Sequence, residues 1–302
     1  MKGQNLPKLA WRNLWRQKRR TILTLVSIVF GFFFAIMINA MQDRVLEDMI
    51  DLAARLGGGH VVVQNKTYIE APSLKYTLVD SGISKSIQER PNVAKVNHRI
   101  TGQAMVATAH QSTGAFFVAY DPAQENKQTL SFLEGIKEGK LLASSGGNGI
   151  VLGQKLAKNL GVKLGSKVVY TLMDKKGEIV SGLGRVRGVI GTGAQGVDSS
   201  LILLPINTVR SYLGYAPNEV TQLAVYLDDP SLSGAISASV SQSLSPTQAG
   251  AYPWSEITPE LKSFIALKVG GARVMAIIIA LLICAGIFNT LFVSVMERMR
   301  EF

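Results

Sequence analysis

The chain has 302 residues, with 32 Lys plus Arg against 21 Asp plus Glu, which gives a formal net charge of +11 at pH 7. Hydrophobic residues make up 47% and the mean hydropathy is +0.21, a composition too apolar for an intrinsically disordered chain. The apolar residues are concentrated near the two ends, so the composition predicts a folded central domain flanked by apolar segments.

Two long uncharged segments account for the apolar excess. Residues 21–41 contain no charge, and 12 of these 21 residues are Ile, Leu, Val or Phe. As a helix this segment is about 31 Å long, enough to cross the hydrocarbon core of a bilayer. Residues 274–295 form a second uncharged run, with 13 of the same four residue types among 22 positions. We therefore predict transmembrane helices at 21–41 and 269–295, with the lipid bilayer as a partner.

A cleaved signal peptide is the alternative interpretation of the first segment, because a basic stretch precedes it. Its apolar core is longer than the roughly 7–15 residues of a signal peptide. Only a poor cleavage motif, Ile38-Asn39-Ala40, precedes Gln42. The sequence thus favours a retained membrane span.

The distribution of charge predicts the orientation of these spans. The first 20 residues hold seven basic and no acidic residues, whereas residues 42–273 hold 23 basic and 19 acidic residues. Since basic flanks stay in the cytoplasm, we predict a cytoplasmic interfacial elbow helix at 1–20, an external domain at 42–268 and a cytoplasmic tail at 296–302. The basic excess belongs to the membrane anchor, so no nucleic-acid partner is expected.

The region between the spans shows mixed α and β patterns. A helical period over 43–56 ends at three glycines, and apolar runs separated by turn residues follow it. In chain order we expect a strand at 60–64, a helix at 81–90, β structure at 93–120, a strand and helix at 150–160, a hairpin at 166–190 with its turn at 174–177, a strand at 200–204, a helix from Pro205, a strand at 221–227, and helices at 231–244 and 258–268. The predicted fold class is α-helical membrane spans plus a mixed α/β domain of two subdomains, one inserted in the other.

No motif of an enzyme or cofactor site is found in the sequence. Residues 135–141 come nearest to a phosphate-binding loop, but they are one residue short and lack its hydroxyl. Residues 191–196 read G-x-G-x-x-G, yet the strand pattern after them argues against a dinucleotide site, which needs a helix there. His60, His98 and His110 are not spaced for zinc, and no cysteine outside the spans can join them. We expect a non-catalytic chain with no cofactor and no metal.

Small residues recur every four positions in both predicted spans. Such stripes let helices approach closely, and asparagine side chains can hydrogen-bond across the contact. The predicted helix-packing residues are Ser27, Gly31, Ala35 and Asn39 in the first span and Gly286, Asn289, Thr290 and Ser294 in the second. Small residues are also common in membrane spans that make no such contact.

Several segments together resemble one family of membrane proteins. Residues 9–21 read LAWRNLWRQKRRT, and the second span with its tail, residues 286–301, reads GIFNTLFVSVMERMRE. Between them stand GGHVVVQ at 58–64, IVLGQKLAKNLGVKLG at 150–165 and DSSLILLP at 198–205. These segments resemble the MacB-type and lipoprotein-releasing (Lol-type) ABC permeases of the FtsX-like superfamily, and the tail is the most specific of them.

The resemblance implies a permease with four spans, whose periplasmic domain lies between the first two. That domain is expected to consist of a porter-like part, about 42–120 and 215–268, and a sabre-like part, about 121–214. Two of the four spans are present in this sequence, so it is expected to be a fragment or the product of a truncated gene. Residues 296–302 would begin the cytoplasmic coupling helix, with Glu297, Arg298, Arg300 and Glu301 facing the ATPase.

The partners implied by the resemblance are a separate cytoplasmic ABC ATPase that hydrolyses ATP, a second permease copy or paralogue, and a periplasmic carrier or adaptor protein. The expected function is ATP-driven transport by mechanotransmission (type VII) at the inner membrane, through lipoprotein release or export of another substrate. Two alternatives stay open. One is a two-span membrane sensor, and the other is a cell-division-type permease that regulates cell-wall hydrolases.

The predicted hairpin is the expected site of contact with a periplasmic partner. Its position matches the sabre hairpin that hooks the carrier in one Lol-type subunit, although it lacks that hook's proline. Apolar side chains beside lysines can combine apolar contact with electrostatic steering. The residues expected to touch the partner are Leu172, Met173, Lys175 and Lys176. A solvated turn is the alternative.

Overall fold

The computed structural model describes residues 49–299, except 52–53, 144–146, 245–248 and 297–298, together with scattered positions between 18 and 40. The chain forms two compact units, one made of residues 48–261 and the other of residues 1–47 and 262–302. The elbow helix predicted at 1–20 and most of the helical stretch predicted at 43–56 lie outside the described residues.

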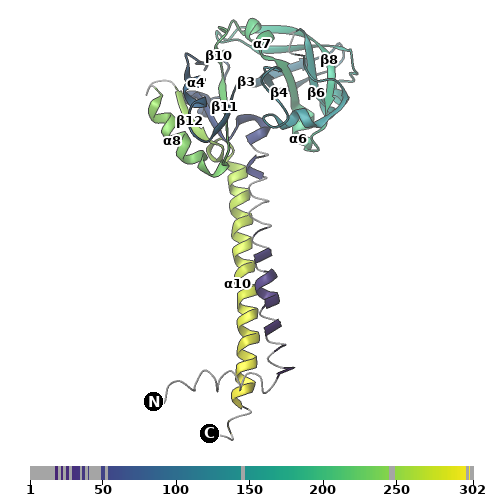
Figure 1. Cartoon of the computed structure of the whole chain (residues 1–302). Helices are drawn as coiled ribbons and strands as arrows, with labels where there is room; N and C mark the ends of the chain where they lie inside the picture. Colours follow the sequence, from purple (N-terminus) through teal and green to yellow (C-terminus); the bar gives the residue numbers. More distant parts are fainter. Residues whose placement is uncertain are drawn as a thin grey trace. The chain divides into compact units, whose positions relative to one another are not determined.

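The unit of residues 48–261 is built on one ten-stranded mixed sheet, with strands in the order β12-β1-β11-β3-β4-β9-β6-β8-β5 and with β7 paired to β3 and β8 (Figure 1). A separate pair, β2 and β10, completes the β structure of the described residues. The strands are β1 (Val61–Asn65), β2 (Leu78–Val79), β3 (Val93–Ala107), β4 (Ser112–Tyr120), β5 (Ile136–Gly139), β6 (Gly149–Gly153), β7 (Lys167–Met173), β8 (Ile179–Ile190), β9 (Leu201–Pro205), β10 (Glu219–Val220), β11 (Gln222–Leu227) and β12 (Ala249–Pro253).

Short helices cover parts of this sheet. Figure 1 shows α8 beside β12 and α6 beside β6. The helices are the π-helix η2 (Ala54–Gly58), α3 (Lys66–Glu70), α4 (Ile83–Gln88), the 3₁₀ helix η3 (Ser131–Gly135), α5 (Gln154–Asn159), α6 (Gln195–Ser200), α7 (Ile206–Leu213), the 3₁₀ helix η4 (Pro230–Leu232), α8 (Ser233–Ser243), α9 (Trp254–Ile257) and α10 (Pro259–Met296).

Strand β3 connects the two halves of the sheet. Its 15 residues pair antiparallel with β11 through their first part, from Val93 to Arg99. From Arg99 to Ala107 the strand pairs antiparallel with β4, and at Met105–Ala107 also with β7. The two parallel pairings of the sheet, β4 with β9 and β6 with β8, lie beyond β4. One continuous sheet therefore runs through both the porter-like and the sabre-like parts expected from the sequence.

Two groups of buried apolar side chains form the core. The larger group includes Val63 on β1, Phe117 on β4 and Leu152 on β6, so it extends across the sheet. The smaller group includes Tyr120 and Phe132 and packs under the segment that follows β4. With no disulfide among the described residues, burial of these side chains is the main source of stability for the domain.

Most elements expected from periodicity are present within a few residues of their predicted ends. The strand at 60–64, the helix at 81–90 and the hairpin with its turn at 174–177 correspond to β1, α4 and the β7–β8 pair. The expected mixed α/β domain is thus confirmed. The prediction was wrong just after Gly196, where a strand pattern was expected from Val197, because residues 195–200 form helix α6. The strand expected at 200–204 is present as β9, Leu201–Pro205. Strand β12 was not predicted.

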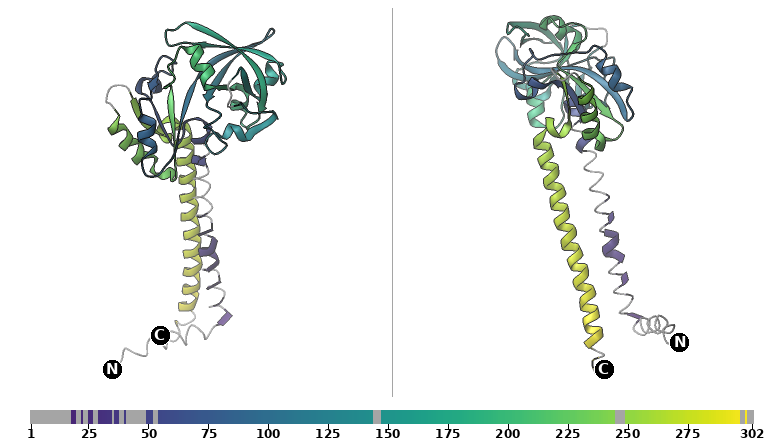
Figure 2. Two further views of the ribbon diagram at one scale, coloured as in Figure 1. Left: turned by 45° about the horizontal axis from the view of Figure 1, so that its top comes forward. Right: turned by 90° about the vertical axis from the view of Figure 1, so that its left-hand side faces the viewer.

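The other unit contains most of α10, which continues without a break for 38 residues (Figure 2). Its residues 262–288 are long and apolar enough to cross a membrane by length and composition. The amphipathic helix predicted at 258–268 is the beginning of this same helix. Among the described positions of the first apolar segment, residues 29–34 are helical.

Candidate functional site

The β7–β8 hairpin has a well-defined turn. Met173 and Ile179 form the last pair of the two strands. Within the turn, Oδ1 of Asp174 accepts hydrogen bonds from the backbone N–H groups of Lys176 and Glu178, both at 2.8 Å. Gly177 adopts a φ of 86°, a left-handed conformation that glycine accepts at little cost. These local bonds hold the tip of the hairpin in one conformation.

Alternation along β7 places successive side chains on opposite faces of the hairpin. Val168, Tyr170 and Leu172 are buried in the core, whereas Val169 and Met173 are exposed. The expectation that Leu172 touches a partner was therefore wrong, because only 3% of this residue is exposed. Because alternate residues of a strand share a face, Leu172 lies on the buried face with Tyr170, and Met173 lies on the exposed face.

Exposed apolar side chains continue from the hairpin onto the neighbouring strands. Register places them on one face, since Val169 pairs with Leu183 and Ala107, and Met105 pairs with Thr171. Met173 and Ile179 are 56% and 75% exposed. We call this surface the exposed β-face; its apolar residues are Met105, Phe116, Val169, Met173, Ile179 and Leu183. Monomeric soluble domains rarely expose an apolar patch of this kind unless it binds something.

Basic residues border the exposed β-face. Lys167 and Arg185 form a register pair in which both side chains are exposed, so two like charges lie opposite each other. Arg185 donates a hydrogen bond from Nη1 to the carbonyl oxygen of Gly165 at 3.0 Å. At the other end, Lys176 forms no side-chain hydrogen bond or ion pair with any described residue. A partner with acidic groups around an apolar centre would complement this surface.

Lys175 has a different role from Lys176. Its Nζ lies 3.2 Å from Oε2 of Glu219 and 5.8 Å from the centre of the Tyr215 ring. Thr77 and the backbone N–H of Ala216 also donate to the Glu219 carboxylate, at 2.6 and 2.9 Å. Burial alone would raise the pKa of Glu219, but these bonds and the Lys175 charge outweigh it and lower the pKa. Lys175 thus ties the turn to the segment at β10.

The glycine-rich loop at 191–196 is filled by a side chain of the protein itself. Oδ1 of Asp198 accepts hydrogen bonds from the backbone N–H and the hydroxyl of Thr192, both at 2.7 Å, and Oδ2 accepts from the N–H of Gly193 at 3.2 Å. A helix does follow these glycines, contrary to expectation. The backbone amides that would face a dinucleotide phosphate are nevertheless bound to Asp198.

The residues predicted for helix packing and ATPase coupling are described only in part. A Cβ added to Gly31 would lie 2.7 Å from Cδ1 of Ile283, so the first apolar segment approaches α10 closely at this glycine. Gly286 lies on α10, as do Asn289, Thr290 and Ser294, whose side chains are not described. The residues that lie outside the described ones are Ser27, Ala35, Asn39, Glu297, Arg298, Arg300 and Glu301.

Charged contacts that join distant segments were not predicted from the sequence. Arg99 and Glu125 pair inside the domain, and Arg55 on the π-helix pairs with Glu134 at 3.0 Å. The partners in these pairs stand far apart in the sequence, and no motif links them. Alternation along β3 could have placed Arg99 in the interior, but nothing in the sequence identifies its partner.

These observations define a class of protein. Its members have a mixed α/β domain with an exposed apolar face, followed in the chain by one long apolar helix. A family model described as the MacB-like periplasmic core domain matches residues 21–243. The chain therefore belongs to the MacB-like family, and the predicted resemblance to the MacB-type ABC permeases is confirmed.

Two solved structures are similar to this chain at low identity. One is the extracellular domain of the noncanonic ABC-type transporter YknZ from Gram-positive bacteria, 12% identical with a TM-score of 0.44, covering 63% of this chain and 99% of that chain. The other is the periplasmic region of MacB from Actinobacillus actinomycetemcomitans, 14% identical with a TM-score of 0.48, covering 71% of this chain and 98% of that chain. A comparison with curated protein sequences finds no match.

Proposed function

We propose that the chain is the transmembrane permease subunit of an ATP-driven ABC transporter that works by mechanotransmission. The observation that carries this proposal is the family match, which begins in the first apolar segment and extends through most of the domain. In this mechanism a separate ATPase binds and hydrolyses ATP, and its closure moves the membrane helices. The external domains of two permease subunits then move relative to each other and act on a substrate.

Each part of the chain has a role in this proposal. Residues 21–41 and 269–295 cross the inner membrane, and they hold the domain at 42–268 in the periplasm. Close approach at Gly31 supports packing of the two membrane helices against each other. The segment at 296–302 begins the coupling helix, whose alternating charges meet the ATPase.

The exposed β-face is the proposed contact with a periplasmic carrier or adaptor. Met173 and Ile179 supply the most exposed apolar surface, and Lys176 steers an acidic partner toward it. Lys175 is engaged with Glu219 and stabilises the turn instead. The substrate passed on through this contact is a lipoprotein or another molecule taken from the inner membrane or periplasm.

Reversal of charge in the coupling segment tests the proposal. In the full-length protein, Glu297→Lys together with Arg300→Glu should reduce co-purification of the ABC ATPase and uncouple ATP hydrolysis from transport. Lys85→Glu with Glu89→Lys, at exposed positions on α4 and at its C-cap, is the matched control and should change neither. Unchanged association and coupling in the first variant would contradict the assignment of this segment as the ATPase contact.

A further inference from the structure

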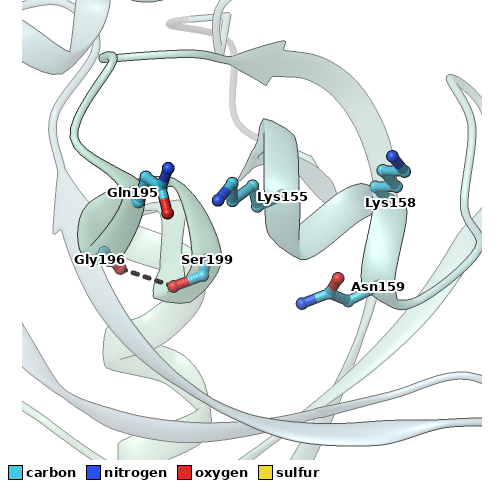
Figure 3. A pocket seen from close by; sticks show the side chains of 6 residues that line it. All are labelled: Lys155, Lys158, Asn159, Gln195, Gly196 and Ser199. Carbon is cyan, nitrogen blue, oxygen red and sulfur yellow. Dashed lines mark hydrogen bonds between the residues drawn. The ribbon is translucent and has the colours of Figure 1, made fainter.

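An open pocket of about 500 Å³, lined by residues with polar side chains, lies between α5 and α6, apart from the exposed β-face (Figure 3). Its volume is within the range of sites that bind small molecules. Helix α5 contributes Lys155, Lys158 and Asn159, and α6 contributes Gln195, Gly196 and Ser199. None of these six residues was assigned a role by the sequence.

The two helices that form the walls are held close together. A Cβ at Gly153, the residue before α5, would collide with the backbone carbonyl of Asp198 in α6, so only glycine fits there. The three hydrogen bonds that Asp198 accepts from Thr192 and Gly193 fix the start of α6. The pocket therefore exists before any ligand binds, which reduces the entropy lost on binding.

The lining of the pocket is positively charged. Lys155 and Lys158 are three residues apart on α5; Figure 3 shows the Lys155 side chain directed toward Gln195 and the Lys158 side chain directed away from it. No Asp or Glu lines the pocket. Asp198 lies near Lys155 and lowers the local positive potential, but its oxygens are occupied by Thr192 and Gly193 and form no ion pair with Lys155 among the described residues.

Hydrogen-bond donors dominate the remaining lining. Within the part of the chain that the structure describes, the side chains of Lys155, Lys158, Asn159 and Gln195 form no hydrogen bond or ion pair with another residue. Figure 3 shows Lys155 and Gln195 facing each other across the pocket. The Ser199 hydroxyl already donates to the carbonyl oxygen of Gly196 at 2.9 Å. Two ammonium groups and two amides are thus available to a ligand that accepts hydrogen bonds.

We propose that this pocket binds a phosphate-bearing small molecule or headgroup. A phosphate ester carries close to two negative charges at neutral pH and several acceptor oxygens, which matches two lysines supported by two amides. A single carboxylate would leave one ammonium group unpaired.

The first test uses pyrophosphate as the probe and the full chain in zwitterionic detergent at low ionic strength, with binding measured by calorimetry. We expect saturable binding, and a dissociation constant at least tenfold higher for Lys155→Gln/Lys158→Gln. Lys85→Gln/Lys127→Gln removes the same charge at exposed positions elsewhere and should stay within twofold of the original chain. No binding to the original chain, or equal loss in both double variants, would overturn the proposal.

A second variant removes no lysine. Asn159→Asp places a carboxylate in the lining and should weaken pyrophosphate binding at least tenfold, whereas Gln128→Glu adds the same charge at an exposed loop position and should have no effect. Circular dichroism establishes that each variant is folded. Binding that is equal in Asn159→Asp and Gln128→Glu would contradict a specific site.

The source of the phosphate is distinguished in lipid nanodiscs. If the ligand is a lipid headgroup, replacing part of the phosphatidylcholine by phosphatidic acid should weaken pyrophosphate binding at least fivefold through competition, and Lys155→Gln/Lys158→Gln should abolish that competition. If the ligand is a soluble phosphate ester, glycerol 3-phosphate should compete with pyrophosphate, and the lipid composition should have no effect. Failure of both competitors would overturn the assignment to phosphate-bearing compounds. These tests are independent of ATPase coupling, so they can fail without affecting the proposed permease function.

Discussion

Arg99 on β3 and Glu125, in the segment after β4, form an ion pair of 2.6 Å between Nε and Oε1, with side chains only 0% and 1% exposed. The hydroxyl of Tyr226 and the carbonyl oxygen of Thr129 also accept from Nη2 of Arg99, at 2.7 and 2.9 Å. Asn97 donates to the other Glu125 oxygen at 2.8 Å. This network fixes the segment at 121–130 against β3 and β11.

Removing one member of this buried pair should be more harmful than removing both. Arg99→Met leaves the Glu125 carboxylate buried without its partner and should cost about 3–5 kcal/mol of unfolding free energy. Arg99→Met with Glu125→Leu removes both charges and should recover most of that loss. Denaturant unfolding followed by circular dichroism measures the difference. A double variant as unstable as Arg99→Met alone would show that the charges themselves are not the cause.

The exposed β-face should be required for partner contact but not for folding. Met173→Ser with Ile179→Ser removes exposed apolar surface, so the unfolding free energy should change by less than about 1 kcal/mol. A photoreactive residue at position 181 should crosslink the original chain to its partner in cells. In the double variant, most of this crosslinked product should be lost. Val79→Ser, at an exposed apolar site on β2, is the control and should leave the product unchanged. Full crosslinking and transport in the double variant would show that the hairpin only connects β7 to β8 and does not contact a partner.

Leu172 provides the complementary test, because it lies on the other side of the same strand. Leu172→Ala should lower the unfolding free energy by about 2–5 kcal/mol, as expected when a buried leucine is truncated. Thermal and denaturant unfolding of this variant and of Met173→Ala can be compared directly. Similar stability of the two variants would contradict the register of β7.

The Lys175–Glu219 contact predicts a dependence of stability on pH. The pKa of Glu219 is lowered from 4.5 in the folded chain, so the carboxylate stabilises the fold above about pH 4.5. This contribution is lost as the pH falls through the lower, folded-state pKa. The stability difference between the original chain and Glu219→Gln should therefore shrink between pH 5 and pH 3. A difference that grows over this range would contradict the assignment.

Glycine at position 153 should be essential for the packing of α5 against α6. Gly153→Ala forces a Cβ into the carbonyl of Asp198 and should destabilise the domain by about 1–3 kcal/mol. Gly234→Ala, in α8 with open space around its Cβ, should stabilise it by about 0.5–1 kcal/mol. Unfolding measurements on both variants decide the point. A Gly153→Ala chain as stable as the original would show that the two helices are not in contact there.

The elements predicted correctly from the sequence are those whose signals are local. Alternating apolar residues and the Asp174–Gly177 turn identify the β7–β8 hairpin without tertiary information. Helix α6 was missed because its serines and the apolar run after them read as one strand, while the bonds from Thr192 and Gly193 to Asp198 fix the helical turn instead. Leu172 was misplaced because proximity to the turn was given more weight than the period of the strand.

The contacts that hold the site could not be predicted, since they join residues far apart in the sequence. Glu219 is 44 residues from Lys175, and Tyr226 is 127 residues from Arg99. Only the order of strands in the sheet brings these groups together. The pocket between α5 and α6 depends in the same way on a contact between Gly153 and Asp198 that no local pattern encodes.

The proposed permease function requires the MacB-like domain to lie outside the cytoplasm. Single cysteines at positions 12 and 140, in a Cys284→Ser background, can be labelled in intact spheroplasts with a membrane-impermeant maleimide. With the domain outside the cytoplasm, position 140 should be labelled without lysis, and position 12 only after lysis. Labelling of position 12 but not of position 140 in intact spheroplasts would contradict it.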